Sequence, residues 1–260
     1  MKRVLAVLGL AALLATLGYG AEGGRQVLIL YDEKAQMDVL AKRLRADGYG
    51  VDFVSVKETL PDLKPYYAVI VFIHGAFPAQ QAEAVIRYTQ AGGRMIGLHH
   101  TISSGKVKTP AWLKFLGVEM PKGDPLKGSY GWEEGVDLRL VNLAPDHYIT
   151  THDVTYKERT DYKRSDVEEP SRTRECVDFP DSEVYVNHQF TDDKEKTILY
   201  GFVCHTKKKL GDRTWMQDRG GWVKRAGKGW IFYFMPGHTV REFENPIFQQ
   251  IVVNCLTWNP

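Results

Sequence analysis

Two adjacent histidines, His99 and His100, end a short apolar run in a tight polar turn. The run, residues 94–98, follows a Gly-Gly pair and has the composition of a buried strand. In open α/β sheets ligands bind at the carboxyl ends of strands, and a G-x-nucleophile-x-G turn there presents a Ser or Cys. Here His99 stands at the nucleophile position and Thr101 at the second glycine. Imidazole is a metal ligand and a general base near neutral pH, so the turn predicts metal or acid–base chemistry at His99. The alternative is a histidine that only caps the turn.

A second candidate, His238, follows the apolar run 230–234 and a Pro-Gly break. Because the ends of parallel strands meet at one edge of a sheet, His238 is predicted to lie near His99. Two imidazoles and a carboxylate would form a site for a divalent Zn, Mn, Fe or Ni ion, and all three residues are candidates for catalysis. Glu183, which precedes a predicted strand, is the preferred carboxylate, although it could instead orient Tyr185 or an arginine. The other candidate carboxylates are Glu242 and Asp153.

Contacts to substrate are predicted for a further set of histidines and aromatic residues. This set comprises His74, His100, Tyr130, Trp132 and His152. His74 ends an apolar run, 67–73, and therefore belongs on the same edge as His99. The aromatic residues lie in Gly-rich polar segments, as do Trp215 and Trp222, where a ring beside polar groups suits the C–H face of a sugar. Single exposed aromatic side chains also occur without a function.

Residues 1–20 have the pattern of a secretory signal peptide. The segment begins with Lys2 and Arg3, continues with an apolar run at 4–17 and ends with small residues before Ala21. The run is short for a bilayer span, so we expect a secreted or periplasmic protein with no stable membrane insertion after cleavage; a retained anchor is the alternative. The formal net charge of +2 equals the charge of Lys2 and Arg3, so the remaining chain is neutral and no nucleic-acid partner is expected.

The three cysteines do not form a disulfide framework, because their number is odd. Cys204 and Cys255 lie in apolar runs and are predicted to be buried thiols. Cys176 lies in a charged segment and could pair or stay free. No C-x-x-C pair is present, so a thiolate zinc site is not expected.

Strand and helix patterns alternate from residue 25 to residue 98, which predicts right-handed β-α-β crossovers and a parallel sheet covered on both faces. The charged stretch 153–175 is predicted to be a solvated excursion. The stretch 207–222 is predicted to be a polar connection between strands. A single amphipathic helix is expected over 243–258.

Several segments together resemble the ThuA-like family, which is named for trehalose utilisation. They are Phe72-Ile73-His74-Gly75, Gly92-Gly93-Arg94 with Gly97-Leu98-His99-His100, His147-Tyr148-Ile149-Thr150, Asp181-Ser182-Glu183-Val184-Tyr185, Gly227-Lys228-Gly229-Trp230-Ile231-Phe232-Tyr233, and Gly237-His238. The resemblance implies an amidotransferase-like α/β fold: a flavodoxin-like, doubly wound, mostly parallel sheet with helices on both faces and long inserted loops. It also implies one domain over 21–260. The chain departs from the family at Tyr148, where a proline is common, and in lacking a histidine at 122–132.

The resemblance implies a setting in carbohydrate metabolism, and some relatives are associated with 3-keto glycosides. We therefore expect an exported carbohydrate-active enzyme that uses a metal to cleave, or to abstract a proton from, an oxidised sugar. It would not be a glutamine amidotransferase, because the nucleophile is absent. The alternative is a non-catalytic module that binds sugar or acts as a scaffold. A serine hydrolase based on Ser103 or Ser104 is disfavoured, because neither residue has the flanking glycines. The sequence carries no signal for oligomeric state.

Overall fold

The computed structural model describes residues 25–102, 109–192 and 195–260. The predicted signal peptide, Ser103 and Ser104 lie outside these residues. The first half of the chain is a regular α/β unit. Its elements are β1 (Gln26–Tyr31), α1 (Lys34–Ala46), β2 (Gly50–Ser55), β3 (Ala68–Phe72), α2 (Ala79–Gln90), β4 (Arg94–Leu98), the 3₁₀ turn η1 (His99–Ile102) and α3 (Pro110–Leu116).

The second half is dominated by longer strands and closes with two helices. Its elements are β5 (Val118–Glu119), the 3₁₀ turn η2 (Pro125–Lys127), β6 (Gly131–Asn142), α4 (Tyr148–Thr151), β7 (Glu158–Tyr162), β8 (Arg172–Val186), β9 (Gln189–Phe190), β10 (Lys196–Thr206), β11 (Arg213–Ala226), β12 (Gly229–Phe234), α5 (Val240–Glu244) and α6 (Pro246–Thr257).

Ten strands of the described residues form one mixed sheet in the order β2-β1-β3-β4-β12-β11-β10-β6-β8-β7. The strands from β2 to β12 are parallel neighbours. Every neighbour from β12 onward is antiparallel. The expected parallel sheet is therefore confirmed for the strands from β2 to β12, but the sheet as a whole is mixed. The physical reason is that hairpins join most strands of the second half, and a short connection can only bring its strands together antiparallel.

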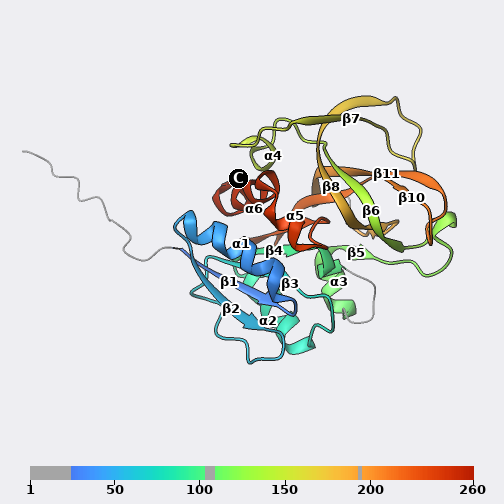
Figure 1. Cartoon of the computed structure of the whole chain (residues 1–260). Helices are drawn as coiled ribbons and strands as arrows, with labels where there is room; N and C mark the ends of the chain where they lie inside the picture. The colour runs from blue at the N-terminus through green and yellow to red at the C-terminus, as the bar shows by residue number, and fades with distance from the viewer. Residues whose placement is uncertain (1–24, 103–108, 193–194) are drawn as a thin grey trace, which may run out of the picture.

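Buried side chains explain why the parallel strands form. All five residues of β3 are buried, as is typical of a strand with both faces covered. Helices α1, α5 and α6 contact one another, and α2 contacts α3. In Figure 1, α1, α5 and α6 lie together above strands β1 to β4, while α2 lies below them. The carboxyl ends of β3, β4 and β12 thus meet between these helices and the antiparallel strands.

Two expectations about the second half are corrected. The stretch 153–175 is not only a solvated excursion, because it contains β7 and the start of β8, which pair with each other. The stretch 207–222 contains most of β11, and its Trp215 and Trp222 are buried. In both stretches polar residues face solvent from one side of a strand, which hid the strand pattern.

The predicted helix over 243–258 is divided into α5 and α6 at Asn245. Residues before a proline avoid helical geometry, and the Asn245 side chain accepts hydrogen bonds from the amides of Ile247 and Phe248. All three cysteines are buried and free, as expected for two of them. Among the described residues, no helix is long and apolar enough to cross a membrane.

Candidate metal centre

The turn after β4 holds His99 in a strained backbone conformation. Its φ is 43°, in the left-handed region that residues other than glycine rarely adopt. The turn closes on Gly97, where an added Cβ would lie 2.7 Å from the Thr101 side chain. The Thr101 hydroxyl donates to the carbonyls of Val71 and Leu98 and fixes the turn on β3 and β4. Strained backbone conformations of this kind are frequent at functional sites, and the strained residue here is a histidine.

The orientation of the His99 ring follows from its two partners. Its Nδ1 lies 2.5 Å from the carbonyl oxygen of Met235, which can only accept, so Nδ1 carries the hydrogen. In its neutral form the ring then has its lone pair on Nε2, and this nitrogen faces Glu183 Oε2 at 3.0 Å and the Tyr185 hydroxyl at 3.2 Å. A histidine ligand of a metal ion is held in the same way, with its second nitrogen on a carbonyl.

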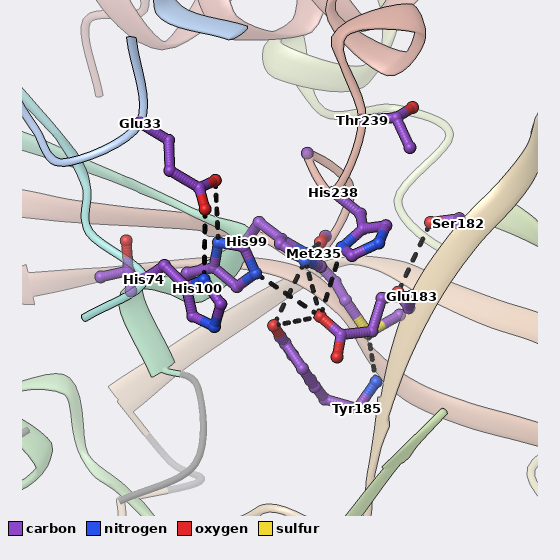
Figure 2. Close-up of polar contacts among 12 residues, drawn as sticks. Glu33, His74, His99, His100, Ser182, Glu183, Tyr185, Met235, His238 and Thr239 are labelled. Atoms are coloured by element: carbon purple, nitrogen blue, oxygen red, sulfur yellow. Dashed lines mark hydrogen bonds and ion pairs between the residues drawn. The ribbon is translucent and has the colours of Figure 1, made fainter. Parts of the chain in front are cut away.

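Glu183 lies at the centre of the cluster, on β8. Figure 2 shows its carboxylate facing three imidazole rings and the Tyr185 hydroxyl. That hydroxyl donates to Oε2 at 2.8 Å. The nearest nitrogens of His100 and His238 lie 3.5 and 3.6 Å from Oε2. His99, His100, Glu183 and His238 form a group whose ligand atoms all lie within 4.8 Å of one another, so the cluster could hold a metal ion.

The electrostatics of the cluster favour a cation beside Glu183. Burial acts to raise the pKa of this carboxyl, but its close contacts with His100, His238 and His99 hold that pKa well below its usual range. Burial lowers the pKa of His100 to about 3, so His100 is neutral. The hydrogen bond to Glu183 raises the pKa of His238. The carboxylate is therefore charged, and a proton on His238 or a metal ion can balance it.

The loop that carries His238 is fixed by Glu242. The Glu242 carboxylate accepts hydrogen bonds from the amides of Gly237 at 2.5 Å and Thr239 at 3.2 Å. An added Cβ on Gly237 would lie 3.0 Å from the His99 Cβ, so this glycine lets the two histidine turns approach. The side chain of His238 is 28% exposed, which makes it the more open part of the cluster.

A rim of more exposed residues continues from His100. Its ring stacks on that of His74, with 4.1 Å between ring centroids. His74 Nδ1 lies 3.2 Å from a carboxylate oxygen of Glu33. The Asp32 side chain accepts from the amides of His74 and Gly75 and joins the turns after β1 and β3. Glu33, His74 and His100 form a second group that could hold a metal ion.

The structure thus brings together five of the residues singled out in the sequence. They are His74, His99, His100, Glu183 and His238. Sequence reasoning missed Glu33 and considered Tyr185 only as a partner of Glu183. Glu33 follows strand β1 closely, so the strand-end argument used for His74 would have found it.

The remaining predicted site residues lie outside the cluster. The Tyr130 ring lies 6.2 Å from that of Tyr185, and Tyr130 also lines a groove of about 1000 Å³ beside α3 and β5. One face of Trp132 is covered by the Lys209 ammonium, 3.2 Å from the ring centroid. His152 stacks on Tyr148 next to α6 and is not brought to the cluster.

The two other candidate carboxylates are also placed. Glu242 is buried and serves the loop of His238, whereas Asp153 is exposed beside His152. Neither belongs to the groups of ligand atoms found in the described residues.

Fold and site together define a mixed α/β domain whose central strand ends carry a buried carboxylate among imidazoles. The sequence profile of the ThuA family, described as trehalose utilisation, matches residues 28–259. The chain belongs to this family.

Solved structures show the same fold at low sequence identity. A ThuA-like protein of Bacteroides uniformis has a TM-score of 0.59 and 18% identity, with 90% of this chain and 91% of that chain covered. The carbohydrate deacetylase Agd3 has a TM-score of 0.54 and 13% identity, with 89% of this chain and 32% of that one covered. A β-galactosidase of Rahnella sp. R3 has a TM-score of 0.50 and 13% identity, with 89% of this chain and 30% of the β-galactosidase chain covered. No curated protein matches this chain.

Proposed function

We propose that this chain is an exported carbohydrate-active enzyme in which His99, His238 and Glu183 hold a divalent metal ion. The observation that carries the proposal is the orientation of His99. Its Nδ1–H is taken by the Met235 carbonyl, so the lone pair of Nε2 faces the carboxylate of Glu183. Two electron-rich atoms at 3.0 Å require a cation or a proton between them, and a histidine held on a carbonyl is typical of a metal ligand.

The spacing of the donor atoms fits one ion. Zinc–ligand bonds are about 2.1 Å long, so two ligands of one tetrahedral ion lie about 3.4 Å apart. The nitrogens of His99 and His238 lie 3.0 and 3.6 Å from Glu183 Oε2. Three protein ligands with one open position are the pattern of catalytic metal sites, and the partial exposure of His238 gives access from solvent. Zn, Mn, Fe and Ni are compatible with this donor set.

When bound, a divalent ion would polarise a carbonyl or hydroxyl oxygen of a sugar. Around it, Tyr185 donates to Glu183 and orients the carboxylate. His74 and Glu33, on the exposed rim, supply hydrogen-bonding groups for sugar hydroxyls. The groove bordered by Tyr130 gives an apolar and aromatic surface for a second ring of the substrate. The turn after β4 carries His99 where an amidotransferase has its cysteine thiol, so acyl transfer from glutamine is not supported.

The substrate class follows from these groups and from the family. The family description is trehalose utilisation, which supports a sugar as ligand. An oxidised sugar, such as a 3-keto glycoside, offers a carbonyl for the ion and an acidic neighbouring C–H. The reaction we propose is cleavage of the glycosidic bond, or proton abstraction next to the carbonyl. Residues 1–20 are proposed to direct export, leaving one domain over 21–260.

Metal content and sugar turnover test the proposal together. The purified protein should contain a divalent ion in stoichiometric amount and convert a 3-keto glycoside. His99→Ala and His238→Ala should lose both properties, whereas His205→Ala, an exposed histidine paired with Asp212, should keep them. A wild-type protein without metal and without turnover would remove the proposal. Saturable sugar binding without product, unchanged by a chelator, would instead establish a binding module.

A further inference from the structure

Next to the proposed metal centre lies a second set of possible ligands, Glu33, His74 and His100. The nearest nitrogen of His100, Nδ1, lies 3.9 Å from Glu33 Oε2, and His74 Nδ1 lies 3.2 Å from Glu33 Oε1. The three ligand atoms lie within 4.8 Å of one another. Figure 2 shows Glu33 above both rings, with dashed contacts to each.

The His100 ring supplies an independent observation. Only 3% of the residue is exposed, and its Nδ1 has no hydrogen-bond partner. Its other nitrogen, Nε2, lies 3.5 Å from the carboxylate of Glu183, which can only accept. If Nε2 carries the hydrogen and donates it to Glu183, Nδ1 is a bare lone pair that is buried and aimed at a second carboxylate.

The distance between Nδ1 of His100 and Glu33 decides what fits between them. At 3.9 Å the two atoms are too far apart for a hydrogen bond. This separation exceeds by about 0.5 Å the distance of about 3.4 Å between two ligands of a tetrahedral zinc ion, and the partly exposed Glu33 side chain can close that difference. His74 already stacks on His100 and contacts Glu33, so its ring lies beside the two other ligands of the set. Two histidines and one carboxylate then repeat the ligand types of His99, His238 and Glu183.

We propose that Glu33, His74 and His100 hold a second divalent cation, beside the one assigned to His99, His238 and Glu183. This inference rests on the proposed function and extends it to a centre with two ions. His100 connects them, because its Nε2 hydrogen-bonds to a ligand of the inner ion while its Nδ1 binds the outer one. Two neighbouring ions would bind two adjacent oxygens of the substrate, such as the carbonyl and a neighbouring hydroxyl of an oxidised sugar.

Metal titration of the full-length protein tests the second site. The protein is stripped with a chelator and titrated with Zn²⁺, and in parallel with Mn²⁺, by calorimetry, with metal content measured after dialysis. We expect two ions per chain. Loss of a group that only orients a metal ligand costs about 10- to 100-fold in affinity, so Glu33→Gln and His74→Ala, which remove ligands, should each weaken one of the two ions by about 100-fold or more and leave the other unchanged. Glu183→Gln should abolish the other ion.

His152→Ala is the matched control, because His152 is also an exposed histidine beside a carboxylate, at Asp153. It should leave two ions with unchanged affinity. Glu33 and His74 lie at the surface, and unchanged melting of the stripped variants will show that they fold. One ion per chain in the wild type, removed by Glu183→Gln, would overturn the second site and leave the proposed function standing. Two ions that Glu33→Gln and His74→Ala leave unaltered would also overturn it, and no ion at all would overturn both.

Discussion

Replacing Tyr185 by phenylalanine removes one hydroxyl from the wall of the metal centre and leaves the ring in place. The residue is 1% exposed. Burial, and then the charge of Glu183, raises the pKa of the phenol well above its usual value, so the hydroxyl keeps its proton. It donates to Glu183 Oε2 at 2.8 Å and lies 3.2 Å from His99 Nε2. The substitution therefore tests whether this hydrogen bond positions a metal-binding carboxylate.

The expected magnitude follows from the partners of the hydroxyl. A hydrogen bond to a charged group contributes about 1.5 to 3 kcal/mol, so stripped Tyr185→Phe should lose free energy of unfolding in that range. Groups that orient a metal ligand contribute roughly 10- to 100-fold in metal affinity, and we expect a loss of that size for Zn²⁺. Calorimetric titration and urea unfolding, with and without metal, measure the two effects.

Tyr200→Phe is the matched control. Tyr200 is also fully buried, and its hydroxyl hydrogen-bonds Tyr156 at 2.8 Å, away from the histidine cluster. This variant should lose stability without losing affinity for Zn²⁺. If Tyr185→Phe binds Zn²⁺ as tightly as the wild type, or if Tyr200→Phe loses as much affinity, then Tyr185 does not position the carboxylate and the reasoning fails.

Three further predictions concern the framework of the site. Gly97→Ala should lower the free energy of unfolding by about 1 to 3 kcal/mol, measured in urea, because the new Cβ meets the Thr101 side chain at 2.7 Å. Glu242→Ala should weaken Zn²⁺ binding by about tenfold in calorimetry, because the loop of His238 loses its two amide hydrogen bonds; unchanged affinity would count against this role. Burial acts to raise the pKa of Glu133, but hydrogen bonds from three backbone amides lower it below its ordinary value of 4.5, so the stability it contributes is present above about pH 4.5 and is lost as the pH falls through the lower folded pKa. Glu133→Gln should lose about 2 kcal/mol at pH 7 and show a flatter acid side in a pH series of melting curves.

The parallel half of the fold could be predicted because short stretches of sequence carry the signals for its strands and helices. Strand β3 is a continuous apolar run, and β4 is apolar after its first residue, Arg94. Helix α2 and a Gly-Gly pair separate the two strands. Strand ends of a parallel sheet share an edge, so the meeting of His99 and His238 followed from their positions after β4 and β12, which are neighbours.

The antiparallel half could not be predicted in the same way. In β8 and β11 the sequence mixes charged and apolar residues, because one side of each strand faces solvent along part of its length. Such segments look like polar loops until a neighbouring strand is known. Glu183 was chosen because it precedes a predicted strand and matches a family segment. Spacing could not identify it, since β8 reaches the site by pairing with β6 in a register set by a long-range contact.

The residues whose positions were predicted wrongly or missed depend on contacts between segments that are distant in the sequence. Trp215 and Trp222 lie in polar segments, yet both are buried. His152 lies in a polar turn but packs on Tyr148, next to α6. Glu33 went unnoticed because a carboxylate at the start of a helix is usually a surface residue. The strand-end argument would have placed Glu33 on the same edge of the sheet, but its position beside His100 also depends on β1 and β3 being neighbours, which the sequence does not state.

An anomalous-difference map of crystals grown with Zn²⁺ or Mn²⁺ is the most direct test of the metal centre. We expect a peak at bonding distance, about 2.0 to 2.3 Å, from His99 Nε2, His238 and Glu183. Peaks only at other places, or none while His99 Nε2 and Glu183 stay in direct hydrogen-bond contact, would contradict a metal-binding role for these three residues.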